Sequence, residues 1–496
     1  MKRKNRLISL LLALLTISGV VSCGTEQVSD ETTTSGEVTT EPVTTEDTDS
    51  RAAAKDDLPE LNFEGSTLRV LSRAGDADTK IEFCVEEESG DIVEDAVWKR
   101  NLAVQERLHI KIENITTDNT RHTGPADIIR NSVLSGSDDY DVIAGAMYTS
   151  APLVLENLFV DLSKLNYIDP EKPWWNQSFA DLTQYGIGMY VITGELAMTA
   201  TSGLYVTFFN SDRFTEAYPD IDIYKLVNDG DWTLDKLHEL SSGLYRDLNG
   251  DSQYDQDDFY GLYVRNQATL ASDAFVGGVR LSAMKKNGDK YDISLMNDRT
   301  ATYAEKMKSL IYDQESTCRG EYNDATVMTK MVNGSVVFLP WMLSGINDLR
   351  DMKDSFGILP MPKLDESQAE YSTYIHNGST VFTIPKTCKD PDRSAAFLEA
   401  ACAENYRTVT PAYFETAIKV KYTRDEPSAA MLDMIVASAY LDLPFIYANN
   451  LGYVDTLRNM FIDSSNCENL ASTLASLEPT VNAKLEEIFE AYATLD

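Results

Sequence analysis

An alternation of strand and helix patterns between residues 66 and 146 constrains the fold of this chain more than any other feature. The patterns run strand, helix, strand, helix, strand over Ser66–Ser72, Val93–Leu108, Ile110–Ile112, Ile128–Leu134 and Tyr140–Ala146. Strands that alternate with helices form a parallel sheet, and ligands bind beyond the carboxyl ends of such strands. We therefore predict an α/β fold with a ligand site near Arg73 and Ala74 after the first strand and Met147 and Tyr148 after the third.

A second set of patterns indicates a second lobe. Further strands are expected at Met189–Thr193, Tyr205–Phe209, Tyr260–Val264, Ser335–Leu339 and Ser379–Ile384. The chain has 496 residues, which exceeds what one hydrophobic core normally serves. From Asp392 the pattern is mostly helical. The apolar stripe from Leu470 to Leu495 predicts packing on the protein's own lobe rather than a coiled coil, with Pro479 opening a new helix.

The charge of the chain excludes several classes of partner. There are 79 acidic and 43 basic residues, which gives a formal net charge of −36. Phosphate backbones and anionic lipid headgroups are bound by clustered Lys and Arg, so we expect neither a nucleic acid nor a basic membrane contact. The four His residues form no HExxH motif, and no GxSxG motif occurs, which disfavours the zinc and serine hydrolases that carry them.

The first residues predict an exported lipoprotein. Residues 1–22 combine a basic start with a short apolar run, which is typical of a signal peptide and too short for a spanning helix. Val20–Cys23 resembles the bacterial lipobox, so Cys23 is the expected lipidation site, with an ordinary secretory signal as the alternative. Residues 23–57 are rich in Thr and acids and predict a disordered tether. The folded part is then extracytoplasmic and anchored to the cell membrane by its N-terminal lipid.

The loop Asp247–Asp258 (DLNGDSQYDQDD) has the spacing of a calcium loop. Its ligands would be Asp247, Asn249, Asp251, Asp255, Asp258 and the carbonyl oxygen of Gln253. Hard oxygen donors at this spacing wrap Ca²⁺ in EF-hands and in the similar dockerin loops. Ser252 stands where such loops usually have Gly, and Asp258 where they usually have Glu. We predict a structural Ca²⁺ ion that staples the second lobe; a solvated acidic loop is the alternative.

Six segments occur in an order that matches a known family. Counting Tyr140–Ala146 and the following Leu158–Leu165 (LFVDLSKL) as one, they continue with Tyr205–Phe214 (YVTFFNSDRF), Asp231–Leu237 (DWTLDKL), Met331–Trp341 (MVNGSVVFLPW), Phe356–Pro362 (FGILPMP) and Ser379–Ala401. Each segment alone is unspecific, but their joint order resembles the family 1 extracellular solute-binding lipoproteins of ABC importers, which are related in fold to maltose-binding protein. Phe209 before Asn210 departs from the Tyr-Asn pair that this family usually has.

The resemblance implies a periplasmic-binding-protein-like fold of two discontinuous α/β lobes joined by hinge strands, with solute in the cleft between them. Carried onto this chain, lobe 1 takes residues 58–165 plus 325–390, and lobe 2 takes residues 166–324 plus 391–496. Aromatic and polar side chains that bind a sugar are then expected at Trp174, Trp175, Trp341, Tyr148, Asp181 and Tyr413. Adjacent strand residues face opposite ways, so one of Trp174 and Trp175 is expected to face the cleft; packing is the alternative.

The function that the resemblance implies is the capture of an external solute by a monomeric receptor, which delivers it to ABC permease subunits by lobe closure. We expect the solute to be an oligosaccharide, no enzymatic activity, and membrane contact only through the lipid anchor. A surface glycoside hydrolase with paired carboxylates is one alternative, and a non-transport solute sensor is another.

Overall fold

The computed structural model describes residues 48–73, 77–83, 85–117, 124–255, 257–265, 269–281, 284–288, 290–320, 324–414 and 426–495. Cys23 and Ala74, both singled out above, lie outside these residues. By its internal contacts the chain divides into Met1–Thr44 and a second unit, Thr45–Asp496, which contains every element discussed below. In the described ranges, no helix has the length and apolarity needed to cross a bilayer.

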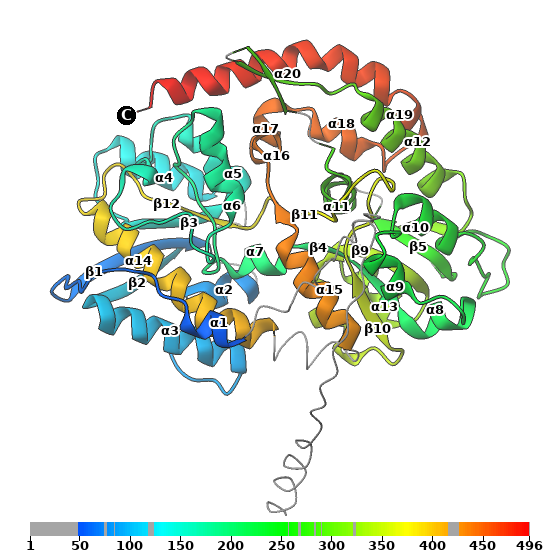
Figure 1. Ribbon diagram of the computed structural model, residues 1–496, viewed down its shortest axis with the longest axis horizontal. Helices are drawn as coiled ribbons and strands as arrows, with labels where there is room; N and C mark the ends of the chain where they lie inside the picture. The colour runs from blue at the N-terminus through cyan, green and yellow to red at the C-terminus, as the bar shows by residue number, and fades with distance from the viewer. Residues whose placement is uncertain are drawn as a thin grey trace, which may run out of the picture. The chain divides into compact units, whose positions relative to one another are not determined.

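The first sheet has four strands in the order β12-β3-β1-β2 (Figure 1). The strands are β1 (Ser66–Arg73), β2 (Ile110–Thr117), β3 (Val142–Ala146) and β12 (Thr380–Thr383). β1 pairs in parallel with β2 and β3, whereas β12 runs antiparallel to β3. The associated helices are α2 (Ala77–Phe83), α3 (Ile92–Leu108), α4 (Gly124–Leu134), α5 (Met147–Val154) and α14 (Pro391–Glu404). The alternating pattern predicted for the first lobe is confirmed.

A helix cap and a buried carboxylate show how local chemistry holds this sheet. The side chain of Asp91 accepts a hydrogen bond from the backbone N–H of Val93 and begins α3. Asp141, just before β3, is fully buried and accepts hydrogen bonds from the backbone and side chain of Arg69 on β1 and from Arg393 on α14. Burial raises the pKa of Asp141, but these hydrogen bonds and charges outweigh it and hold that pKa below its usual range.

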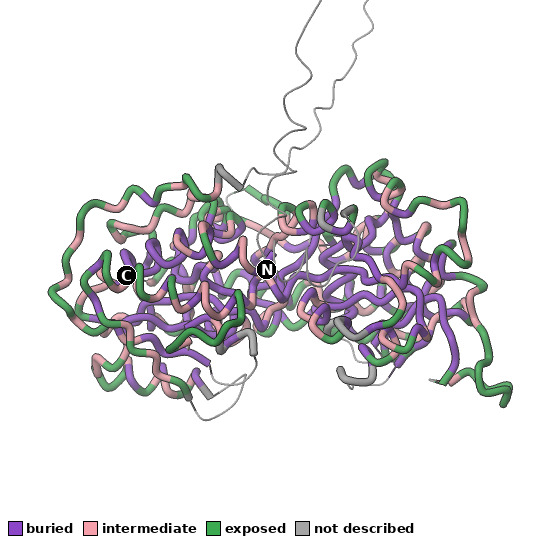
Figure 2. The backbone as a smooth tube through the Cα atoms, turned by 90° about the horizontal axis from the view of Figure 1, so that it is seen from below, coloured by how far each residue is buried: buried purple, intermediate pink, exposed green. Residues whose placement is uncertain are grey.

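The second sheet has five strands in the order β10-β4-β9-β5-β8. The strands are β4 (Tyr205–Asn210), β5 (Tyr260–Arg265), β8 (Thr317–Gly320), β9 (Val336–Met342) and β10 (Phe356–Leu359). β5 is parallel to β8 and β9, and β4 is antiparallel to β9 and β10. Helices beside it are α8 (Ser211–Ala217), α9 (Ile223–Asn228), α10 (Leu234–Ser241), α11 (Thr269–Val279), α12 (Asp298–Tyr312) and α13 (Asp324–Val332). Every residue of β4, β5 and β10 is buried, and Figure 2 shows buried residues in the interior and exposed residues on the outside.

The structure differs from the predicted division into lobes. Residues 325–390 were expected in lobe 1, but β9 and β10 pair with β4 of the second sheet, and only β12 joins the first. Residues 391–496 were expected in lobe 2, yet α14 packs against α3 of the first. The reason is that hydrogen-bond partners far apart in sequence, not proximity along the chain, decide which sheet a strand joins.

Two antiparallel segments, residues 192–205 and 373–382, connect the two sheets, and we call them the crossing segments. Isolated bridges pair Ile192 with Phe382 near the first sheet and Leu204 with Ile375 near the second. Residues 189–193, expected as a strand, form only such a bridge. The short elements α7 (Met198–Ser202) and β11 (Thr373–Tyr374) lie on the crossing segments, and β11 pairs with β13 (Ala439–Tyr440). The two sheets are thus joined by side-by-side chain segments, as the resemblance implied.

The C-terminal region is helical. It contains α15 (Glu426–Ala437), α16 (Leu443–Ile446), α17 (Ala448–Leu451), α18 (Val454–Asn459), α19 (Ser464–Glu468) and α20 (Leu470–Ala493). Pro479 was expected to open a new helix, but it lies inside the continuous α20. The helix continues because buried Leu474 and Val481 on either side of Pro479 pack on the core, which outweighs the loss of one N–H donor. The tail of the chain packs on its own core, as predicted.

Helix α20 touches parts of both sheet regions. Near its beginning, Glu478 accepts hydrogen bonds from the backbone N–H groups of Leu295 and Met296, which follow the hairpin β6 (Met284–Asn287) and β7 (Lys290–Ile293). Near its end, the ring of Tyr492 lies 5.8 Å from that of Tyr190, in the segment that leads to the first crossing. Figure 1 shows α20 running past both groups of strands.

Residues 48–57 correct the predicted extent of the tether. They were expected to be disordered, but α1 (Thr48–Ala53) is a helix, and Asp56 is buried. The carboxylate of Asp56 pairs with Arg107 of α3 and lies 3.6 Å from Arg407. Two cations from the folded lobe therefore hold this acidic residue in place. Both are far from Asp56 in the sequence, so the local composition of residues 48–57 could not indicate them.

Candidate functional site

The carboxyl ends of strands from both sheets meet the crossing segments, and we call this region the sheet junction. It contains Arg73, Tyr148, Thr199, Tyr205, Arg265, Trp341, His376 and Thr380. In the first sheet, β1 ends at Arg73, and the N-terminus of α5 follows β3 directly. In the second sheet, β5 ends at Arg265, and Tyr205 at the start of β4 pairs with Met342 at the end of β9. This is the position where α/β sheets place their ligands.

Arg73 connects the first sheet to the second crossing segment. Its side chain is buried, and its Nη atoms donate hydrogen bonds to the carbonyl oxygen of Gly378 at 2.7 Å and to Oγ1 of Thr380 at 2.8 Å. Its Nε is also buried and has no hydrogen-bond partner among the described atoms. Two hydrogen bonds therefore fix this positive group, and the N–H at its Nε has no acceptor among the described atoms.

Glu82 on α2 ties both crossing segments to the first sheet. Its carboxylate accepts hydrogen bonds from the N–H of Thr199 at 3.0 Å, from Oγ1 of Thr199 at 2.7 Å and from Oγ1 of Thr380 at 2.8 Å. Burial raises the pKa of Glu82, and the charge of Arg73 opposes that rise. One buried acid thus holds both crossing segments, and one buried base holds the second.

The second-sheet side of the junction is aromatic and cationic. The guanidinium of Arg265 lies 5.5 Å from the ring centroid of Trp341, which is within the range of a cation–π contact. The ring of Tyr205 lies 6.2 Å from that of His376 on the second crossing segment. Trp341, a predicted ligand-binding residue, is at the junction but is only 4% exposed. In this arrangement it supports Arg265 rather than presenting a free ring face.

Tyr148, another predicted ligand-binding residue, lies at the first-sheet side. It is half-buried, and its backbone N–H donates to the carbonyl oxygen of Asn377 at 3.1 Å. Burial raises the pKa of its phenol to about 12, and the positive charge of Arg73 works in the opposite direction. The phenol therefore stays neutral at physiological pH and can both donate and accept hydrogen bonds.

Trp174 and Trp175 have a different role from the one expected. Both rings are buried, and both indole N–H groups donate to the carboxylate of Glu399 on α14, at 3.2 and 2.8 Å. We expected adjacent side chains to face opposite ways, but the pair lies in a turn that ends in a single bridge, where the alternation of a strand does not hold. The structure supports the packing alternative for both residues.

Asp181 and Tyr413, the remaining predicted ligand-binding residues, lie on other elements. Asp181 ends the short helix α6 (Gln177–Asp181), is exposed, and contributes to the raised pKa of Tyr185, which burial mainly causes. Tyr413 is buried and packs edge-on against Phe414 at 5.6 Å. Neither placement indicates contact with a solute, so both assignments stay predictions.

One backbone angle in the predicted calcium loop fits that prediction. Ser252 has a φ of 60°, the left-handed conformation that the usual Gly adopts easily. The side chain of Asp247 accepts hydrogen bonds from the N–H groups of Gly250 and Ser252, and the carboxylate of Asp258 accepts from Tyr245 at 2.8 Å. Among the described residues, no group of three or more His, Cys, Asp or Glu is placed to hold a metal ion. The Ca²⁺ ion stays a prediction.

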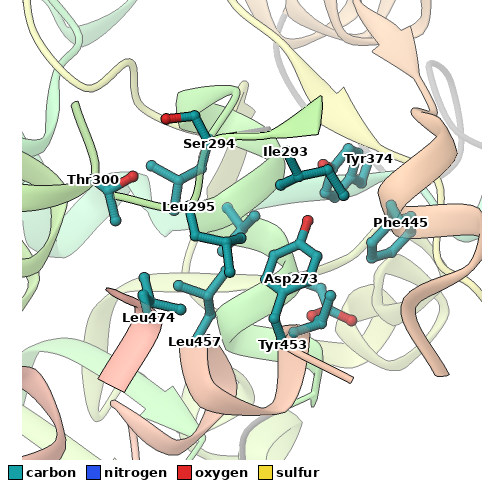
Figure 3. A pocket seen from close by; sticks show the side chains of 13 residues that line it. Asp273, Ile293, Ser294, Leu295, Thr300, Tyr374, Phe445, Tyr453, Leu457 and Leu474 are labelled. Atoms are coloured by element: carbon teal, nitrogen blue, oxygen red, sulfur yellow. The ribbon is translucent and has the colours of Figure 1, made fainter. Parts of the chain in front are cut away.

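A pocket beside the second sheet is too small for a solute. Its walls include Asp273, Leu295, Tyr374, Phe445 and Leu457 (Figure 3). Its volume is about 20 Å³, whereas a single water molecule already needs about 10–15 Å³. Asp273 is also paired with Arg458 by two hydrogen bonds of 3.0 and 2.8 Å. This pocket cannot hold a sugar ring, and the sheet junction is the better candidate.

The sequence pointed to Arg73, Tyr148 and Trp341 at the junction but missed Glu82, Thr199 and His376. Their positions in the sequence were the only available indication of a role at the junction. Thr199 lies between the predicted strands 189–193 and 205–209, and His376 lies shortly before the predicted strand 379–384. Glu82 carries no motif and is one acid among 79 acidic residues. Its role follows from α2 folding back onto the crossing segments.

A family model described as bacterial extracellular solute-binding protein matches residues 126–408, more than half of the chain. No curated protein matches. Solved structures do match: the galacto-N-biose-/lacto-N-biose I-binding protein from Bifidobacterium longum has a TM-score of 0.54 and 12% identity over 87% of this chain and 99% of that chain.

Two further solved structures are similar. The ABC substrate-binding protein Lmo0181 from Listeria monocytogenes has a TM-score of 0.51 and 12% identity over 85% of this chain and 99% of that chain. A cyclo/maltodextrin-binding protein has a TM-score of 0.51 and 13% identity over 87% of this chain and 98% of that chain. These likenesses confirm the predicted two-lobed α/β fold. The family match confirms the predicted relationship and an extracytoplasmic location: the chain belongs to the bacterial extracellular solute-binding proteins.

Proposed function

We propose that this chain is the solute-binding receptor of an ABC importer and that its solute is an oligosaccharide. The similar proteins support this proposal, because they include an ABC substrate-binding protein in complex with cycloalternan, an ABC transporter's binding protein in complex with lacto-N-biose and a binding protein complexed with maltotetraose. The alternatives of a glycoside hydrolase and a non-transport sensor gain no comparable support.

The observation that carries the proposal is the sheet junction itself. Two separate sheets direct their strand ends to one region, and the crossing segments, residues 192–205 and 373–382, connect the sheets there. A solute that contacts both sides gains more contacts when the sides approach each other. Binding then shifts the population toward the closed form by the difference in affinity between the two forms.

Tyr148 and Arg73 are the side chains through which we propose that the first-sheet side binds solute. Tyr148 is half-buried and carries an aromatic ring and a neutral hydroxyl, and Nε of the buried Arg73 has no hydrogen-bond partner among the described atoms. Trp341 supports the opposite side through Arg265. An apolar ring face together with a few fixed donors is the chemistry that binds sugars, whose rings have apolar C–H faces and polar rims.

Two further features of the proposal concern attachment and stability. Lipid on Cys23 would hold the receptor at the cell membrane, and one or two additional acyl chains would make that attachment lasting. A Ca²⁺ ion on Asp247, Asn249, Asp251, Asp255 and Asp258, with the carbonyl of Gln253, would fix the loop that leads into β5. The left-handed Ser252 backbone supports this second feature.

Calorimetry with maltotetraose, lacto-N-biose, xylotetraose, cellotetraose and unrelated solutes such as amino acids tests the function. We expect micromolar or tighter binding of at least one oligosaccharide, loss of that binding in Tyr148→Ala, and a smaller radius of gyration in solution scattering when the ligand is present. The same samples should release no reducing ends from the glycans. Binding only of a non-sugar solute, or release of reducing ends, would contradict the proposal.

A further inference from the structure

A surface groove lies along the edge strand β8, away from the sheet junction. Its walls come from three places: the predicted calcium loop with Tyr254, the C-terminal end of α12 with Tyr312, and β8 with Arg319. β8 is the outer strand of the second sheet, and Tyr260, which also lines the groove, is at the amino end of β5. The sheet junction is at the opposite, carboxyl ends of these strands. The groove has a volume of about 510 Å³, which is enough for a sugar unit.

Tyr254 presents an aromatic ring to solvent in this groove. Its side chain is 59% exposed, and no other aromatic side chain in the described part of the chain is as exposed. The ring is nevertheless held in place, because its centroid lies 4.5 Å from that of Tyr245, which in turn lies 5.4 Å from the ring of Tyr260. Exposure of this apolar face to water is unfavourable in the free protein. Because the ring is already fixed, it loses little conformational entropy when a partner covers it.

Polar groups surround this ring. A hydrogen bond to Glu315 raises the pKa of the Tyr254 phenol. Gln314 donates through its amide nitrogen to the carbonyl oxygen of Leu310 at 2.8 Å and to Oγ1 of Thr317 at 2.7 Å, while its amide oxygen is buried without a hydrogen-bond partner. Across the groove, the guanidinium of Arg319 lies 4.5 Å from the ring centroid of Tyr312. The groove therefore combines apolar ring faces with hydrogen-bond donors and acceptors.

The charge of the groove decides which ligand chemistry it suits. Asp313 and Glu315 line it against the single lining cation Arg319, and Asp255, which also lines it, is one of the predicted Ca²⁺ ligands. An anionic ligand such as a phosphate or a carboxylate would be repelled by this surplus of acids. A neutral ligand with many hydroxyl groups can instead donate hydrogen bonds to carboxylates while an apolar face covers the Tyr254 ring.

We propose that this groove is a second carbohydrate-binding site, which takes a neutral sugar unit of a longer glycan on the ring of Tyr254. The site is separate from the solute site at the sheet junction and does not depend on the function proposed there. It would hold the receptor against a polysaccharide while the junction takes up free oligosaccharides. Tyr254 is the stacking residue, and Glu315 and Gln314 are the polar partners.

Native electrophoresis in gels that contain soluble starch, barley β-glucan or arabinoxylan tests the site, since the net charge of −36 gives the protein high mobility in such gels. We expect at least one polysaccharide to retard the wild-type protein. In Tyr254→Ala the affinity for that polysaccharide should fall about tenfold, the loss expected for one stacked aromatic contact. Tyr254→Phe should keep most of the retardation, because it keeps the ring.

Two control variants separate this site from folding and from the junction. Leu248→Ala removes a side chain that is 57% exposed in the same loop but does not line the groove, and its mobility should equal that of the wild type. Tyr148→Ala should keep its retardation even though it loses oligosaccharide binding in calorimetry. Unchanged thermal unfolding of Tyr254→Ala would show that the fold is intact.

Three outcomes would overturn the proposal. They are equal retardation of the wild type and Tyr254→Ala, no retardation of the wild type by any of the three polysaccharides, and loss of retardation in Tyr148→Ala instead. Failure of the junction function gives a different result: calorimetry detects no oligosaccharide, while the retardation that depends on Tyr254 persists.

Discussion

Glu399 offers the sharpest test of the energetics of this fold. Its carboxylate is fully buried on α14 and accepts both indole N–H groups of Trp174 and Trp175. Burial raises its pKa from the ordinary 4.5 to about 7, and the hydrogen bonds from Trp175, Asp169 and Trp174 only partly oppose this rise. The folded protein therefore binds the Glu399 proton more tightly than the unfolded chain does.

The sign and size of the effect follow from linkage. A rise of the pKa from 4.5 to about 7 corresponds to about 3 kcal/mol of folding free energy. This stabilisation is complete below pH 4.5 and is lost as the pH rises to 7, since the proton must then leave a buried site. Above pH 7 the folded state carries a buried carboxylate whose desolvation the indoles offset only in part.

Glu399→Gln removes the titration and keeps a side chain of the same size. We expect the free energy of unfolding of Glu399→Gln, relative to the wild type, to rise by about 3 kcal/mol between pH 4.5 and pH 8. Urea unfolding followed by tryptophan fluorescence measures it at several pH values. Glu487→Gln, an exposed change on α20, is the matched control and should show no such trend. A difference between Glu399→Gln and the wild type that does not change with pH would refute the reasoning.

Three further predictions concern the second sheet region. Arg458→Met leaves the buried Asp273 without its partner and should lower the free energy of unfolding by about 3–5 kcal/mol. Arg458→Met combined with Asp273→Leu should recover much of this loss. If urea unfolding gives the single and the double variant the same loss, the prediction is contradicted. Leu485→Ala on α20 should cost about 2–5 kcal/mol by the same measurement, because the side chain is fully buried, and a loss below 1 kcal/mol would show that α20 is not firmly packed. Chelation of Ca²⁺ with EGTA should lower the melting temperature of the wild type but not of Asp247→Asn combined with Asp251→Asn, and calorimetry that detects no Ca²⁺ binding would exclude the predicted ion.

Much of the fold could be predicted because it depends on local patterns. β1, α3, β2, α4 and β3 follow from apolar spacing that neighbouring residues determine, and α10 begins where Thr233 caps it. Arg73 and Tyr148 could be named in advance, because parallel strands end at the same edge of a sheet.

The sequence by itself determined the fold class and the family, and it predicted the strand ends at which a solute site is expected. The tertiary structure decided the rest: that β9 and β10 join the second sheet, that the indoles of Trp174 and Trp175 both donate to the buried Glu399, and that Glu82 joins the crossing segments. These outcomes depend on partners far apart in the chain, and a buried hydrogen-bonding group takes whichever partner the completed fold brings within reach. Periodicity predicts which side chains are buried, but the fold determines which of them meet.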